Sequence, residues 1–93
     1  MEIKVRRMFG EEVHSARKKA QITLEEVSRK CQAGKSYICG IELCKVSPPR
    51  PRITKKLCDI LGLDYRRMLA LRALALAPDD LGLDDIRKAL NSL

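Results

Sequence analysis

The stretch Thr23–Glu42, TLEEVSRKCQAGKSYICGIE, predicts two short helices joined by a tight turn. Thr23 and Glu26 have the T-x-x-E spacing of a capping box. In such a box the threonine hydroxyl accepts a hydrogen bond from the Glu amide, and the carboxylate reaches back to the threonine amide. Apolar residues then recur at the spacing of one helical face: Leu24, Val27 and Cys31. The stretch therefore begins with a capped amphipathic helix.

The turn and the second helix are predicted from residues 32–43. Gly34 is expected to interrupt the first helix, because glycine adopts backbone angles that other residues avoid. The second helix should run from about Lys35 to Leu43, with Ile38 and Ile41 on its inner face. Its outward residues are small or cationic: Lys35, Ser36, Cys39 and Gly40. Two helices joined in this way can fit a DNA major groove.

The motifs around this stretch resemble, in their order, the Xre/Cro-type helix-turn-helix domain of phage repressors and small bacterial regulators. The resemblance covers residues 9–64 and is carried by FGEEVHSARKKA, ITLEEVSRKC, GKSYICGIE, KVSPPRP and ITKKLCDILGLD. It implies an all-α fold, a compact five-helix lambda-repressor-like DNA-binding domain with a short C-terminal tail or helix. The family often pairs an Arg of the first helix with the Glu that closes the second helix of the unit, the recognition helix. The resemblance thus implies an ion pair between Arg17 and Glu42.

The resemblance and the apolar pattern divide the chain into three parts. Residues 1–8, MEIKVRRM, form a basic N-terminal arm, and residues 9–77 form the helix-turn-helix DNA-binding domain, with its two-helix unit at 23–43. Three more helices are predicted within that domain, at about residues 10–20, 52–61 and 65–77. Residues 78–93 follow as a C-terminal tail or short helix, a possible dimerisation element.

The charge of the chain is unevenly distributed. Of its 19 Lys and Arg and 12 Asp and Glu, residues 1–77 hold 17 and 8, and residues 78–93 hold 2 and 4. A basic body of this kind fits a polyanionic partner, with a soluble protein that has solvated cationic faces as the alternative. Arg6 and Arg7 of the arm could enter a minor groove, unless the terminus is frayed and solvated.

Candidate base-reading residues lie on the recognition helix: Lys35, Ser36, Tyr37, Cys39 and Gly40. Lys35 can donate to guanine O6 and N7, and Cys39 can touch a thymine methyl. Gly40 has no side chain, so the backbone there would approach DNA closely. Candidate phosphate contacts are a helix N-terminus and the cations of a proline-rich loop: Thr23, Lys45, Arg50 and Arg52.

The helix predicted at 65–77 carries apolar residues around most of its circumference: Met68, Leu69, Leu71, Leu74 and Leu76. One small domain covers a single side of such a helix, so these residues are the candidate dimer interface. The alternative is a core helix buried wholly within one chain. A dimer would place two units about one helical turn of DNA apart, on a palindromic operator.

Neither a catalytic nor a metal site is expected. His14 is the single histidine and has no nearby Asp or Ser constellation, so an exposed surface position is expected. The four cysteines form no C-x-x-C pair, which argues against zinc: Cys31, Cys39, Cys44 and Cys58. Reduced thiols that act as small apolar fillers are expected. Redox or metal sensing at Cys39 and Cys44 is the alternative, and no cofactor is expected.

The leading interpretation is a cytoplasmic, sequence-specific, homodimeric transcriptional regulator that represses a phage promoter, a mobile-element promoter or its own. One alternative is the DNA-binding antitoxin of a toxin–antitoxin pair, which would have a protein partner. Another is a helical protein-interaction module that does not bind DNA specifically, whereas an enzyme is not expected. The richest apolar run, 68–77, is short and contains Arg72, so no membrane contact is expected. The charged N-terminus lacks the apolar core of a signal peptide.

Overall fold

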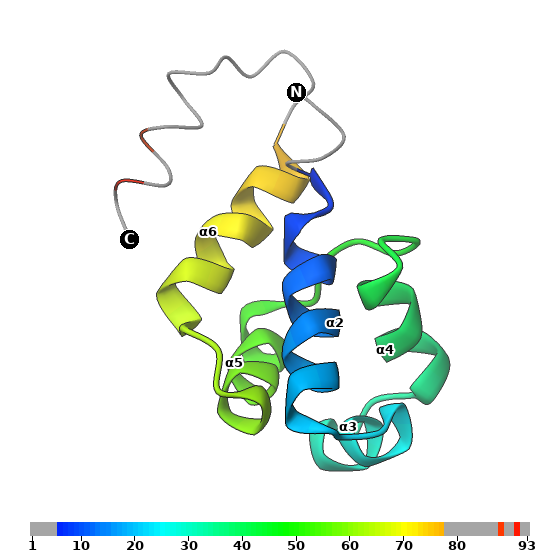
Figure 1. Cartoon of the computed structure of the whole chain (residues 1–93). Helices are drawn as coiled ribbons and strands as arrows, with labels where there is room; N and C mark the ends of the chain where they lie inside the picture. Colours follow the sequence, from blue (N-terminus) through cyan, green and yellow to red (C-terminus); the bar gives the residue numbers. More distant parts are fainter. Residues whose placement is uncertain (1–5, 78–87, 89–90, 92–93) are drawn as a thin grey trace.

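The computed structural model describes residues 6–77, 88 and 91 of the chain. Five helices follow one another over residues 6–77: α2 (Met8–Ala20), α3 (Leu24–Cys31), α4 (Lys35–Glu42), α5 (Pro51–Leu61) and α6 (Tyr65–Leu76). Figure 1 shows them packed around α2, and the described residues contain no strand. The predicted all-α fold with five helices is confirmed, with helix ends within two residues of their expected positions. Because α2 begins at Met8, the arm ends earlier than predicted, and most of the predicted tail lies outside the described residues.

Side chains cap the N-termini of two helices. The Thr23 hydroxyl accepts a hydrogen bond from the Glu26 amide at 3.1 Å, and it also lies 3.4 Å from the Glu26 carboxylate. The Asp64 carboxylate accepts hydrogen bonds from the amides of Arg66 and Arg67 at the start of α6. These contacts satisfy amide groups that have no partner within the helix. The sequence therefore sets the starts of α3 and α6 locally.

The turn between α3 and α4 differs from the prediction. Gly34 has φ −65° and ψ 144°, an ordinary extended conformation, whereas Gln32 takes the left-handed conformation at φ 57° and ψ 41°. The Gln32 amide donates to the Arg29 carbonyl, and the Ala33 amide donates to the Ser28 carbonyl. This helix-ending motif requires the left-handed residue immediately after the last helical one, which is position 32. The expectation that Gly34 needs special backbone angles was wrong.

The hydrophobic core is built from twelve buried residues of all five helices: Phe9, Val13, Val27, Cys31, Ile38, Ile41, Leu57, Cys58, Leu61, Met68, Leu71 and Leu74. Helix α2 packs against α4, α5 and α6, and α3 packs against α4 and α5. Cys31 and Cys58 are core residues as expected, and burial raises the pKa of both thiols. Burial of apolar surface between these helices therefore holds the fold together, with α3 attached through α4 and α5.

Helices α2 and α4 meet at a glycine. A Cβ atom on Gly10 would lie 2.3 Å from the Ile41 carbonyl oxygen and 2.8 Å from the Cys44 sulfur. No side chain fits at such distances, so glycine is required for this close approach of two helices. Cys44 follows α4 in a left-handed conformation at φ 60°, and its thiol donates a hydrogen bond to the Arg7 carbonyl.

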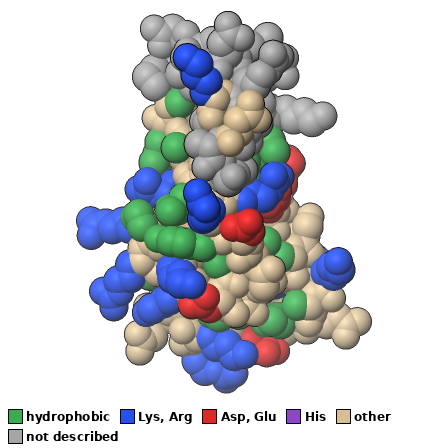
Figure 2. Space-filling model, turned by 90° about the vertical axis from the view of Figure 1, so that its left-hand side faces the viewer, with side chains coloured by type: hydrophobic (Ala, Val, Ile, Leu, Met, Phe, Trp, Pro, Cys, Tyr) green, Lys and Arg blue, Asp and Glu red, His purple; other side chains and the backbone are tan. Residues whose placement is uncertain are grey.

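Helix α6 is largely a core helix, which corrects the predicted dimer interface. Met68, Leu71 and Leu74 are each at most 1% exposed, because α2 and α5 cover them within the same chain. Leu69 is half-buried and Leu76 is 47% exposed. Figure 2 shows hydrophobic side chains gathered between Lys and Arg side chains on the side of the molecule where α5 and α6 lie. Of the five residues of the predicted interface, only Leu69 and Leu76 thus keep exposed surface for a partner.

The end of α6 is joined to the start of α2 (Figure 1). The Arg6 guanidinium donates to the carbonyls of Ala75, at 3.2 Å, and Ala77, at 2.6 Å. A cation is favourable there because the last carbonyls of a helix carry partial negative charge. The sequence left Arg6 either as a minor-groove contact or as part of a frayed terminus, whereas these hydrogen bonds hold it on the folded domain. Among the described residues, no helix has the length and apolar character needed to cross a membrane.

Candidate nucleic-acid interface

An ion pair fixes the orientation of α4. Arg17 donates from Nε to Glu42 Oε2 at 2.7 Å and from Nη2 to Glu42 Oε1 at 3.1 Å, and both residues are buried. The remaining Arg17 nitrogen, Nη1, donates to the Ile22 carbonyl at 3.0 Å. The hydrogen bond to Glu42 raises the pKa of Arg17, despite the opposing effect of burial. The pair that the resemblance implies is present, and it joins α2, the connection to α3 and the end of α4.

His14 is a third member of this network, which the sequence did not predict. Its Nδ1 lies 2.7 Å from Glu42 Oε1, and its side chain is 48% exposed. The expected exposed position of His14 is confirmed. His14 also precedes Arg17 by three positions and therefore shares its helical face, which brings it to Glu42. Burial alone would raise the pKa of Glu42, but the hydrogen bonds from Arg17 and His14 outweigh it and lower the pKa.

The face of α4 that points away from α2 carries most of the predicted base-reading residues. Lys35, Ser36 and Tyr37 are exposed, and Cys39 is half-buried. The Lys35 ammonium lies 3.2 Å from a carboxylate oxygen of Glu25, in the first turn of α3. Because both side chains of this pair are largely exposed, its contribution to stability is small, and Lys35 can exchange this partner for another.

A shallow hollow lies on this face. It has a volume of about 460 Å³ and is lined by Leu24, Lys35, Ser36, Cys39, Gly40, Leu43 and Lys45. The structure thus brings together four predicted base readers and one predicted phosphate contact around one concavity. Tyr37 is not among its lining residues. Leu24 and Leu43 are members that the sequence did not predict for this face.

Gly40 does not have the position that was predicted for it. It is buried, and a Cβ atom there would lie 3.2 and 3.3 Å from the two γ-carbons of Val46. The loop after α4 therefore covers the space that a side chain would occupy, and this packing explains the small residue. The prediction that Gly40 exposes bare backbone to DNA is therefore corrected. A side chain at position 40 would point toward Val46 and not away from the domain.

The loop from α4 to α5 carries the remaining candidate phosphate contacts. Lys45 and Arg50 in the loop and Arg52 in α5 are all exposed. The loop is held by the buried Pro49, whose carbonyl accepts hydrogen bonds from Thr54 Oγ1 at 3.2 Å and Arg72 Nε at 2.7 Å. In the sequence, Arg72 was noted only as the charge within the apolar run 68–77. The geometry gives it the function of anchoring the loop.

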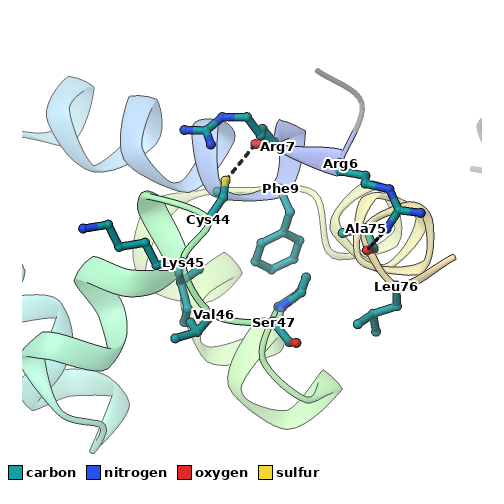
Figure 3. Close-up of a pocket in the computed structure, with 12 residues that line it drawn as sticks. Arg6, Arg7, Phe9, Cys44, Lys45, Val46, Ser47, Ala75 and Leu76 are labelled. Atoms are coloured by element: carbon teal, nitrogen blue, oxygen red, sulfur yellow. Dashed lines mark hydrogen bonds between the residues drawn. The ribbon is translucent and has the colours of Figure 1, made fainter. Parts of the chain in front are cut away.

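A second hollow, of about 410 Å³, lies between the start of α2, the loop and the end of α6 (Figure 3). Its lining includes Arg6, Arg7, Phe9, Cys44, Lys45 and Leu76. Lys45 belongs to both hollows and, in the close-up, extends away from Phe9. Cys39 and Cys44 are free, half-buried thiols. Over the described part of the chain, no three His, Cys, Asp or Glu side chains are grouped so as to hold a metal ion.

Comparison with known proteins identifies this two-helix arrangement. A family model described as a helix-turn-helix domain matches residues 8–75. No curated protein and no solved structure matches the chain. The matched residues extend from the first residue of α2 almost to the end of α6, so they include the capped α3, the Gln32 turn and the exposed α4. The chain therefore belongs to the helix-turn-helix domain family, whose two-helix unit is a DNA-binding motif.

Proposed function

We propose that this protein is a sequence-specific transcriptional regulator of the Xre/Cro type that inserts α4 into the major groove of DNA. One observation carries the proposal. Helix α4 is locked to α2 through Glu42, while its other face presents exposed polar and cationic groups. A rigidly held helix with such a face can read base edges, because reading requires donors and acceptors at fixed positions.

Different residues serve base reading and phosphate binding in this proposal. The base readers are the residues of α4 that remain outward: Lys35, Ser36, Tyr37 and Cys39. Exposed groups around them contact phosphates: Thr23, Lys45, Arg50 and Arg52. Phosphate contacts set affinity and register, whereas base contacts set sequence. The tether from Pro49 to Arg72 supports this division, because it holds the loop that carries Lys45 and Arg50.

The regulator acts as a cytoplasmic homodimer on a palindromic operator, and it represses a phage promoter, a mobile-element promoter or its own. Leu69 and Leu76 are the members of the predicted interface that keep exposed surface. Two subunits would present their α4 helices to successive turns of one DNA face, which requires two half-sites about 34 Å apart. Occupancy of such an operator blocks polymerase, and the proposal needs no catalytic activity.

Selection of bound duplexes from a random DNA pool, at low and at physiological salt, tests this function. A palindromic consensus that survives physiological salt supports a dimeric sequence reader, and Lys35→Ala should then relax one position in each half-site. Lys55→Ala is the matched control, because Lys55 is also exposed and paired to a carboxylate, that of Asp59 on α5. Enrichment at low salt alone, without a consensus, would refute the proposal.

An antitoxin that binds both DNA and a toxin is the second candidate function. The exposed Val46 and Leu76, both lining the hollow of Figure 3, favour it, because exposed apolar side chains in a concavity suit a protein partner. Co-purification of a small protein in a fixed ratio, released by Leu76→Asp, would support this function over a self-contained repressor.

A further inference from the structure

We propose that the hollow on α4 binds the 5-methyl group of a thymine, and that Leu43 is the residue that gives this specificity. The inference rests on the proposed function and names one base that the site prefers. Leu43 was not among the predicted base readers, and its position in the structure argues for the assignment.

Leu43 extends the outward face of α4 by one residue. Its amide donates to the Cys39 carbonyl at 3.0 Å, so the helical spacing continues through the C-cap position. Ser36, Cys39 and Leu43 therefore follow one another along one face, and all three line the hollow. Leu43 is 46% exposed, although it is a large apolar side chain on a basic surface.

The composition of the hollow matches one base edge. Leu24 of α3 and Leu43 supply apolar surface, while Lys35 and Lys45 supply positive charge among the lining residues. Thymine alone of the four DNA bases presents a methyl group in the major groove. A polar base edge placed against the two leucines would lose hydrogen bonds to water without gaining others. The lysines suit the phosphates and polar base edges beside such a methyl group.

Replacement of each thymine of the selected operator by deoxyuridine tests the assignment, since uracil lacks this methyl group and keeps the pairing edge. We expect the replacement to weaken binding by about fourfold at one position in each half-site. This is the effect of removing one methyl-sized apolar group from a buried contact. In Leu43→Ala the same replacement should leave the affinity unchanged within about twofold, because the partner of the methyl group is gone.

Leu63→Ala is the matched control, because Leu63 is also a leucine that lines a hollow, one formed with α2, and belongs neither to the proposed DNA surface nor to the proposed dimer interface. It should keep the full sensitivity to deoxyuridine. If every deoxyuridine operator binds the wild-type protein as well as the thymine operator does, or if Leu43→Ala stays equally sensitive, the inference is overturned and the proposed function survives. If no operator can be selected, the proposed function fails, and the inference fails with it.

Discussion

Glu42 is a carboxylate that is removed from water at the end of α4. It is 6% exposed, and Arg17 satisfies both of its oxygens while His14 adds a bond to one of them. Removal of water from two opposite charges is costly, but loss of one partner is worse, since the other is left buried and unpaired. The pair therefore contributes to a defined orientation of α4 as well as to stability.

Replacement of Glu42 by Gln should lower the free energy of unfolding by about 3–5 kcal/mol at pH 7. The lowered pKa of Glu42 means that its stabilisation is complete above the unfolded value of about 4.3 and is lost as the pH falls through the folded value. Denaturant unfolding at a series of pH values should therefore show that the wild type and the variant become closer in free energy of unfolding as the pH falls. Glu25→Gln, in an exposed pair, should cost much less at every pH. If the difference in free energy of unfolding between the wild type and Glu42→Gln stays constant down to strong acid, this account is contradicted.

Gly10→Ala should destabilise the protein by about 1–3 kcal/mol, the usual cost of overpacking, although alanine is the better helix former. The added carbon would meet the Ile41 carbonyl oxygen, which is backbone and cannot rotate away. Thermal unfolding measures the loss. Gly34→Ala is the control, because nothing lies within 4 Å of its added carbon and its φ is negative. Equal melting temperatures for the two variants would refute the close approach.

At the scale of single residues, the sequence could predict contacts that follow local rules. The cap at Thr23 is of this kind, and the Arg17–Glu42 pair followed from the resemblance to a known family. His14 could not be assigned in the same way, because its partner lies 28 residues away on another helix. The turn was assigned to Gly34 by residue type, whereas the hydrogen bonds that end α3 place the left-handed residue at Gln32.

Helix α4 keeps a glycine in its interior because the following loop folds over it. Gly40→Ala alone should change the free energy of unfolding little, since the gain of about 0.5–1 kcal/mol in helix propensity is offset by contact with Val46. In a Val46→Ala background the same substitution should stabilise by close to that full amount, because the space is then free. Denaturant unfolding of the four proteins of this cycle measures the coupling. Additive effects would mean that Val46 does not limit position 40.

At the scale of helices, the apolar pattern, the capping box and the family resemblance together were sufficient to place all five. They could not show which sides of α6 are covered, because apolar residues surround most of that helix. Packing of α2 and α5 decided the question by burying Met68, Leu71 and Leu74. The sequence likewise predicted a proline-rich loop after α4, but the attachment of that loop to Thr54 and Arg72 depends on the tertiary fold.

For the whole molecule, the excess of positive charge in residues 1–77 should make DNA binding strongly dependent on salt concentration. We expect Arg50→Ala to weaken binding to all sequences alike and to reduce the slope of log affinity against log salt by about one for each bound domain. Arg50 is exposed at the start of α5, so the fold should be unaffected. Binding titrations at several salt concentrations provide the measurement, with Lys55→Ala as the control. A changed consensus sequence with an unchanged slope would show that Arg50 reads bases instead.

The contact of Arg6 with the end of α6 has a mechanical consequence. It joins the start of α2 to the carbonyls of Ala75 and Ala77, so residues 6 and 77 lie side by side. Helices α2 and α6 run in opposite directions from that corner (Figure 1). Tension applied between residues 6 and 77 would load the Arg6 hydrogen bonds first and then peel the two helices apart turn by turn. A pull along the chain therefore acts directly on the contact between the first and last described helices.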